Sequence, residues 1–203
     1  MAVSSGMVMF GPARCVACRA RAGWLCSRCA REAAPPATPV VIPGIARALS
    51  PWTYEGGPRA LVLALKLRHM RSAAVPLVAG IVGTCRSAWF GADAVTWVPA
   101  RARDQARRGF DHAEVLGRGV AHGLGLPPAP VLRRTGMQPD QAGLSRAQRL
   151  SNLDGAFGAV RPVTGHLLLI DDLVTTGATA AACAACLVSA GATQVTLATA
   201  CVA

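Results

Sequence analysis

The sequence predicts an α/β protein, with a mostly parallel sheet flanked by helices and a small N-terminal module that carries four cysteines. Three observations support this. Apolar strand-like runs alternate with helical patterns from about residue 45 onward. The 203 residues are 52% hydrophobic, enough for one ordinary domain core plus a small appendage. Four of the eight cysteines come before residue 33. We therefore expect a module and linker over residues 1–44 and a larger domain over 45–203.

The individual elements follow from composition and periodicity. Residues 33–44 contain four prolines and predict a linker or an extended crossing segment. Beyond them, periodicity predicts helices over 58–69, 72–86, 111–124, 145–152 and 176–191, and strands over 92–99, 165–172 and 192–202. Asp111 is expected to cap the third helix, with Glu114 completing a capping box. Strands and helices that alternate in this order favour a parallel sheet covered on both faces.

The chain is basic, with a formal net charge of +11, and Lys66 is the only lysine among its 21 basic residues. Such a surface suits nucleic acid, phosphorylated ligands or acidic partners without choosing among them. The uncharged run over 173–203 is too rich in Ala, Thr and Gly for a membrane span and predicts a buried helix and strand. Because no export signal is recognisable, we expect a cytoplasmic protein with reduced thiols and no transmembrane segment.

The most informative stretch is LLLIDDLVTTGATA, residues 167–180. Its apolar run is typical of a central parallel strand, and two adjacent carboxylates, Asp171 and Asp172, should end that strand at the ligand-binding edge of the sheet. The carboxylates suit the 2′ and 3′ hydroxyls of a ribose and a nearby Mg²⁺, while the following loop and helix start suit a 5′-phosphate. The predicted phosphate-binding residues are Thr175, Thr176, Gly177, Ala178 and Thr179. The alternative is an ordinary capped turn beside two chance acids.

The cysteines before residue 33 form two CxxC pairs separated by seven residues. These candidate metal ligands are Cys15, Cys18, Cys26 and Cys29. Four thiolates can hold Zn²⁺ tetrahedrally, and the metal would supply folding free energy to a segment with little core. Disulfides are disfavoured in the cytoplasm, and a redox CxxC would need only one pair. The further pair Cys183 and Cys186 is expected to be buried and structural.

In the middle of the chain, arginines follow the strand that ends at Pro99. Arginines and backbone amides at a sheet edge can hold a pyrophosphate, and the alternative is a solvated basic loop. The recognisable motifs in chain order are the four cysteines, a lysine in a helix, Val98-Pro99, R-R-G-F over 107–110, Q-x2-L-x4-R-x2-N-x2-G-A-F over 141–157, and I-D-D-x-x-T-T-G-A-T over 170–179.

On these motifs the chain resembles the ComF/ComFC family, amidophosphoribosyltransferase-like proteins associated with DNA uptake in competent bacteria. Residues 167–180 also resemble the phosphoribosyl-pyrophosphate motif of type I phosphoribosyltransferases. The resemblance implies a type I phosphoribosyltransferase-like fold, phosphoribosyl pyrophosphate bound with Mg²⁺, catalytic positions at Asp171 and Asp172, and partners in a DNA-uptake machine. It implies a pyrophosphate site at Lys66, Pro99, Ala100, Arg101 and Arg108. The chain departs from the family at Asp111-His112, where Asn-Gln is usual.

Two functional hypotheses follow. The first is a Mg²⁺-dependent phosphoribosyltransferase, in which a nucleophile displaces pyrophosphate at C1 of the ribose. The sequence shows no base-recognition hood and no obvious general base for this reaction. The second is a non-catalytic protein that binds single-stranded nucleic acid and retains the sugar-phosphate site, which the cysteine module and the net charge favour. Ribose-phosphate compounds related to phosphoribosyl pyrophosphate are also candidate ligands of the predicted sugar-phosphate site.

Overall fold

The structure, a computed structural model, describes residues 12–88, 91–135 and 155–203. Its main sheet has the strand order β1-β7-β6-β3, and all of these neighbours are parallel. The strands are β1 (Arg47–Leu49), β7 (Gln194–Val202), β6 (His166–Val174) and β3 (Ala94–Trp97). A short strand, β2 (Trp52–Thr53), also pairs in parallel with the end of β7.

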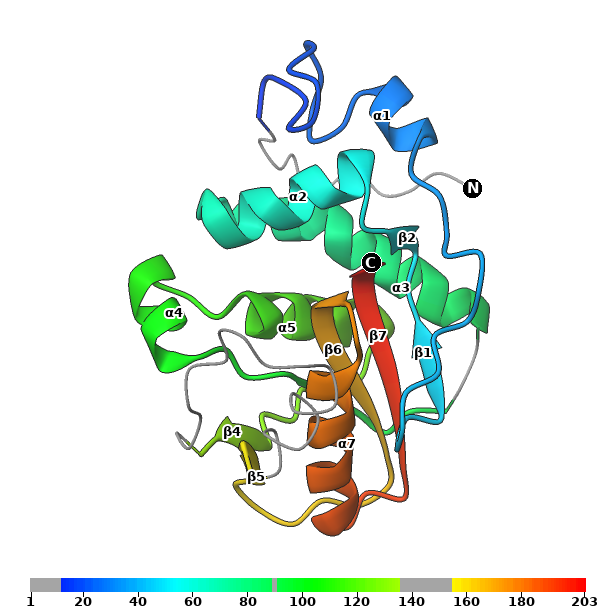
Figure 1. The fold of residues 1–203 in the computed structure, drawn as a ribbon, viewed down its shortest axis with the longest axis vertical. Coiled ribbons are helices and arrows are strands. Elements are labelled where there is room, and N and C mark those ends of the chain that lie inside the picture. The colour runs from blue at the N-terminus through cyan, green and yellow to red at the C-terminus, as the bar shows by residue number, and fades with distance from the viewer. Residues whose placement is uncertain (1–11, 89–90, 136–154) are drawn as a thin grey trace.

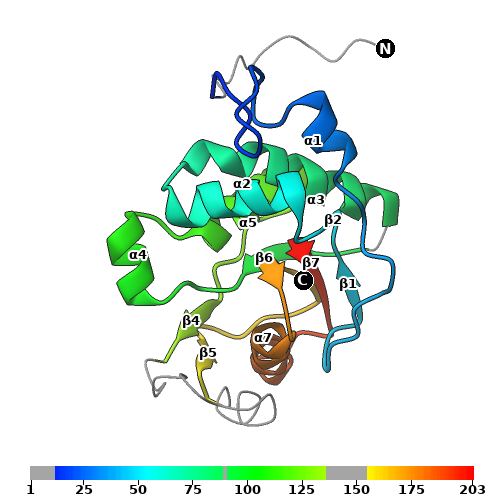
Figure 2. The same cartoon turned by 45° about the horizontal axis from the view of Figure 1, so that its top comes forward.

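Helices cover both faces of this sheet (Figure 1, Figure 2). On one face lie α2 (Gly56–Leu67), α3 (Ala74–Ala88) and α5 (His112–Leu124), with the single-turn η1 (Arg71–Ala73) between α2 and α3. The other face is covered by α7 (Ala178–Ser189). The predicted α/β fold class, a mostly parallel sheet flanked by helices, is therefore confirmed.

Strand β6 is apolar on both faces because the sheet separates two cores. Leu168 and Ile170 pack into the core beneath α2, α3 and α5. Leu167 and Leu169 pack into the core beneath α7. All four side chains are at most 2% exposed. Since successive strand residues point to opposite faces, a strand between two helical layers must be apolar throughout, as the sequence of β6 predicts.

The four-cysteine segment packs against the start of α2 (Figure 1). It includes the short helix α1 (Ser27–Arg31), and its buried Val16 belongs to the same core as α2. A Cβ placed on Gly57 of α2 would lie only 2.9 Å from the carbonyl oxygen of Cys29, so this contact requires glycine. The small N-terminal module is thus confirmed, and its boundary at residue 44 stays a prediction.

Most predicted elements in the described residues end within two residues of the observed ones. Two expectations are wrong. Asp171 and Asp172 do not end strand β6, which runs on to Val174 because that residue still pairs with Val202 of β7. The basic stretch after Pro99 contains a helix, α4 (Ala102–Arg108), because its Ala, Gln and Arg residues are good helix formers. The predicted helix over 145–152 lies outside the described residues.

A small antiparallel pair, not expected from the sequence, joins β4 (Leu132–Arg134) to β5 (Phe157–Ala159). These two strands are only three residues long, and no hydrophobic alternation can be recognised over so short a run. No helix among the described residues has both the length and the apolar character needed to cross a bilayer.

Candidate functional site

A polar cavity of about 280 Å³ lies at the carboxyl ends of β3 and β6. Trp97, the last residue of β3, pairs with Ile170, so the residues that follow in both strands reach the same edge of the sheet. The lining residues are Lys66, Val98, Pro99, Ala100, Arg101, Asp104, His112, Arg134, Asp171, Asp172, Leu173 and Thr179. Larger cavities in the described part of the chain have mainly apolar walls.

The cavity collects residues that were predicted separately from distant parts of the sequence. Seven of them line it: Lys66, Pro99, Ala100, Arg101, Asp171, Asp172 and Thr179. Thr175 and Thr176 are exposed and do not line it, while Gly177 and Ala178 are buried at the start of α7. The side chain of Arg108 lies outside the described part of the structure, as do the family-pattern residues between 136 and 154.

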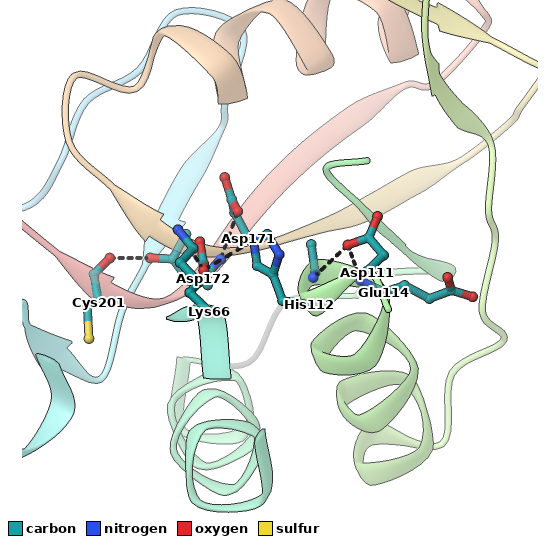
Figure 3. Close-up of polar contacts among 9 residues, drawn as sticks. Lys66, Asp111, His112, Glu114, Asp171, Asp172 and Cys201 are labelled. Atoms are coloured by element: carbon teal, nitrogen blue, oxygen red, sulfur yellow. Dashed lines mark hydrogen bonds and ion pairs between the residues drawn. The ribbon is translucent and has the colours of Figure 1, made fainter. Parts of the chain in front are cut away.

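Asp172 is held by the basic side chains of Lys66 and His112 (Figure 3). Its Oδ2 lies 2.8 Å from Nζ of Lys66 on α2 and 3.3 Å from Nε2 of His112 on α5. The side chain is only 2% exposed. Burial alone would raise its pKa, but the charges of Lys66 and His112 outweigh burial and lower the pKa of Asp172 below its ordinary value. Asp172 is therefore an ionised carboxylate that ties α2 and α5 to β6.

Asp171 has the opposite electrostatic character. Burial and the adjacent charge of Asp172 raise the pKa of Asp171 well above its ordinary value. Its Oδ1 accepts a hydrogen bond of 2.8 Å from the backbone N–H of Asp172. The side chain lines the cavity and, unlike Asp172, keeps partial exposure. Of the two acids, Asp171 is thus the one that is available to a ligand.

The start of α7 faces the same region through Thr179. Gly177 is the N-cap of this helix and has φ +77°, a backbone conformation that L side chains rarely adopt. A Cβ at Gly177 would also lie 2.8 Å from Cγ1 of Ile42, which comes from the proline-rich segment. The positive end of the α7 dipole and its first N–H groups form an electrostatic environment that favours an anion.

The peptide bond between Pro99 and Ala100 is held on both sides. Its carbonyl oxygen accepts a hydrogen bond of 2.8 Å from Nε of Arg134. Its N–H donates to Oδ2 of Asp111, also at 2.8 Å. The Arg134 guanidinium lies 4.6 Å from the ring centroid of Phe157. Burial, together with the charge of Arg101, lowers the pKa of Arg134.

The departure from the family pattern, Asp111-His112, is therefore part of the site. Asp111 caps α5, as predicted, by accepting from the N–H groups of Ala113 and Glu114 at 2.9 and 3.2 Å. The reciprocal half of the predicted capping box is wrong, because the Glu114 carboxylate pairs with Arg118 at 2.8 Å. His112 occupies the first helical position of α5 and contacts Asp172.

Sequence reasoning missed Arg134 and Asp104 as cavity residues and gave no role to His112. Arg134 is one arginine among many and lies on a three-residue strand, so no spacing marks it. Asp104 is placed at the cavity by α4, a helix that was not predicted from the sequence. The role of His112 could have been inferred from Asp111. Because Asp111 caps α5, it fixes the start of the helix and therefore the position of the next side chain, His112.

The four cysteines predicted to bind zinc come together. Their sulfur atoms all lie within 4.8 Å of one another, and Sγ of Cys18 and Cys26 are 3.5 Å apart. A zinc–sulfur distance of about 2.3 Å in a tetrahedron gives sulfur–sulfur edges of about 3.8 Å, so the donor set fits Zn²⁺. Burial raises the pKa of Cys15, but hydrogen bonds from the backbone of Cys18 and Cys26 outweigh it and lower the pKa to about 6. A thiolate there is ready to bind metal.

The second group of possible metal ligands is His112, Asp171 and Asp172, whose donor atoms also lie within 4.8 Å of one another. Carboxylate oxygens suit Mg²⁺. Lys66 already pairs with Asp172, however, so Asp171 is the carboxylate that fits a magnesium ion best, and a bound ligand would have to supply further oxygens.

Known proteins resemble parts of this chain. The DNA utilization protein YhgH of Salmonella typhi is 37% identical over 105 residues, which cover 51% of this chain and 46% of the relative. YhgH of Escherichia coli (strain K12) and of Shigella flexneri are each 35% identical with the same coverage. The chain thus spans about half the length of the curated relatives it matches. No protein-family model matches the chain.

Three solved structures show partial likeness. The allosteric regulatory enzyme of purine biosynthesis is 22% identical, with a TM-score of 0.43 over 62% of this chain and 25% of that one. The B. subtilis glutamine phosphoribosylpyrophosphate amidotransferase is 24% identical, with a TM-score of 0.42 over 61% and 25%. An adenine phosphoribosyltransferase is 14% identical, with a TM-score of 0.39 over 67% and 69%.

Proposed function

We propose that this chain is a phosphoribosyltransferase-like protein that binds a ribose-phosphate compound, phosphoribosyl pyrophosphate above all, in the cavity at the ends of β3 and β6. One observation carries the proposal. Residues singled out from four separated stretches of sequence, around Lys66, Pro99, Asp171 and Thr179, line a single cavity. The alternative, an ordinary capped turn beside two chance acids, does not explain why these acids lie in the same cavity as the lysine of α2 and the loop after β3.

The chemistry of the lining suggests an orientation for the ligand. Asp171, the more available acid, accepts from the ribose hydroxyls. The start of α7, with Thr179, holds the 5′-phosphate through N–H groups and the helix dipole. Lys66, Arg101 and Arg134 supply positive charge on the side where a pyrophosphate would lie. Asp172 keeps Lys66 in place rather than binding the ligand directly.

If the protein turns a substrate over, the reaction is a displacement at C1 of the ribose. The incoming nucleophile forms a bond to C1 as the bond from C1 to the pyrophosphate oxygen breaks, and the electron pair leaves with pyrophosphate. Basic side chains stabilise that charge as it develops. A magnesium ion, when bound with the ligand, would neutralise further phosphate charge. A screen for pyrophosphate release from phosphoribosyl pyrophosphate across candidate acceptors tests for turnover.

Calorimetric titration tests the binding site itself. Wild type is expected to bind ribose 5-phosphate and phosphoribosyl pyrophosphate, and Asp171→Asn and Thr179→Val should each weaken both ligands about tenfold or more, since each removes a charge-assisted or hydroxyl contact. Thr175→Val is the matched control, because Thr175 is exposed and outside the cavity. Equal affinities for the Thr175 and Thr179 variants and for wild type would show that the ligand binds elsewhere.

A second function, binding of single-stranded DNA, is favoured by the surface of the four-cysteine module. Five arginines there are exposed: Arg14, Arg19, Arg21, Arg28 and Arg31. The single acid of this segment, Glu32, pairs with Arg28 at 3.1 Å and leaves the other charges uncompensated by acids of the module. The relatives named DNA utilization protein support a role in DNA use, and we propose a cytoplasmic protein whose partners belong to a DNA-uptake system.

Salt dependence tests this second function. Affinity for a single-stranded oligonucleotide should fall steeply with salt, with each phosphate contact adding about 0.7 to the slope of log affinity against log salt. Arg21→Gln/Arg31→Gln should lower that slope by about 1.4. Arg86→Gln/Arg133→Gln makes the same charge change on exposed residues outside the module and should leave the slope closer to wild type. Absence of binding at low salt would exclude DNA as a ligand.

A further inference from the structure

The Pro99–Ala100 peptide uses both of its polar groups inside the protein. Arg134 donates to its carbonyl oxygen, and Asp111 accepts from its N–H, each at 2.8 Å. Asp111 is 7% exposed, so water does not compete strongly for this contact. Both residues of the peptide line the cavity. A backbone amide at the predicted pyrophosphate loop is thus already occupied by a carboxylate of the protein.

Asp111 can do this because it has two acceptor oxygens with different tasks. Oδ1 accepts from the first N–H groups of α5, at Ala113 and Glu114, and Oδ2 accepts from Ala100. An asparagine has one acceptor oxygen and one donor group, so it cannot cap α5 and also accept from Ala100. The carboxylate therefore couples the start of α5, where His112 contacts Asp172, to the loop after β3.

The charge balance of the cavity adds to this effect. Three basic side chains, Lys66, Arg101 and Arg134, and three acidic ones, Asp104, Asp171 and Asp172, line it. The carboxylate of Asp111 lies directly behind this lining, next to Ala100. A pyrophosphate approaching the loop therefore meets a fixed negative charge and lacks the amide donor that could hold it.

We propose that Asp111 is a specificity-determining residue, a latch that closes the Pro99–Ala100 amide to anions and lowers the contribution of the pyrophosphate group to ligand binding, while leaving the binding of the ribose 5-phosphate part unchanged. This inference rests on the proposed function, because it assigns a preference within the same cavity. Release of the latch has two consequences that act in the same direction. The Ala100 N–H becomes able to turn toward a bound anion, and the repulsion from the carboxylate disappears.

The test compares pyrophosphate and ribose 5-phosphate binding in Asp111→Asn and Asp111→Ser. Both replacements can still cap α5, since Asn and Ser are good N-cap residues, and thermal unfolding checks the fold. Pyrophosphate affinity should rise about tenfold or more, because a unit charge a few ångströms away near a protein surface changes binding by at least that factor. Ribose 5-phosphate affinity should stay within about threefold of wild type. A merely structural change would alter the binding of both ligands, so it would not produce this difference between pyrophosphate and ribose 5-phosphate.

Asp104→Asn is the matched control. It removes one negative charge from the cavity lining without touching the Pro99–Ala100 peptide. If it raises pyrophosphate affinity as much as Asp111→Asn does, general charge rather than the latch is responsible, and the inference is wrong. Unchanged or weaker pyrophosphate binding in both Asp111 variants also overturns it.

The two proposals fail differently. If wild type does not bind ribose 5-phosphate but Asp111→Asn gains pyrophosphate binding, the latch stands and the proposed ligand is wrong. If ribose 5-phosphate binds and the Asp111 variants do not gain pyrophosphate affinity, the latch is wrong. Hydrogen exchange gives a second readout. The Ala100 amide should exchange faster in Asp111→Asn than in wild type, and an equal exchange rate in the two proteins would contradict the latch.

Discussion

Replacing Lys66 with methionine tests how the acid pair is stabilised. Lys66 Nζ lies 2.8 Å from Oδ2 of Asp172, whose side chain is 2% exposed. Methionine keeps an unbranched apolar side chain in the same place and removes the charge. The buried carboxylate then loses its lysine partner, the nearer of the two basic side chains beside it, so the free energy of unfolding should fall.

The structure sets the expected size of this loss. Removing one partner of a buried ion pair costs about 3–5 kcal/mol. The Lys66 side chain is 26% exposed, and His112 still lies 3.3 Å from the same oxygen, so the loss should be smaller. We expect about 2–3 kcal/mol. For a chain of this length, that change corresponds to a fall in Tm of about 4–12 °C.

The assay is equilibrium unfolding of four proteins: wild type, Lys66→Met, Asp172→Asn and the double variant. The double variant should recover most of the stability lost in Lys66→Met, because no charge is then buried without a partner. The effect should also depend on pH. In wild type the lowered pKa of Asp172 gives stability that is present above its ordinary value of 3.8 and lost as pH falls through the folded-state pKa.

In Lys66→Met, burial is no longer opposed by the lysine, so the pKa of Asp172 rises. The variant then takes up a proton at a higher pH than wild type does, and its stability deficit against wild type should shrink as pH falls. A Lys66→Met protein that unfolds within about 0.5 kcal/mol of wild type, with a difference independent of pH, would refute this reasoning.

Two further predictions concern the loop before α7 and the cysteine cluster. Gly177→Ala should cost about 1–3 kcal/mol, because φ is +77° and the new Cβ would meet Ile42, whereas Gly83→Ala in α3, with open space around it, should be neutral or stabilising in thermal unfolding. Freshly reduced protein should contain about one zinc per chain, and Cys18→Ser should lose it while Cys186→Ser keeps it. Metal analysis that returns equal zinc in both variants, or none in wild type, would rule out the cluster as the zinc site.

The parts of the fold that the sequence predicted are those with a local physical signature. β6 is recognisable because a strand buried on both faces must be apolar throughout. The start of α5 is recognisable because Asp111 provides the acceptors that its first N–H groups need. The turn before α7 is recognisable because it contains Gly177, which lets the backbone turn at a φ of +77°.

The parts that were not predicted depend on tertiary contacts. Arg134 reaches Pro99 only because the short strands β4 and β5 carry it to the cavity. Ile42 lies against Gly177 although 134 intervening residues separate them in sequence, and a proline-rich stretch gives no hint of that contact. The different tasks of Asp171 and Asp172 also arise from α2 and α5, which bring Lys66 and His112 to one of the two acids.

The most direct test of the central claim is a crystal structure of the protein with ribose 5-phosphate. The ligand should lie in the cavity at the ends of β3 and β6, with its phosphate at the start of α7 near Thr179 and its hydroxyls at Asp171. The Lys66–Asp172 pair should remain intact beside it. A ligand bound elsewhere on the protein, or placed with its phosphate at the two acids, would contradict the account.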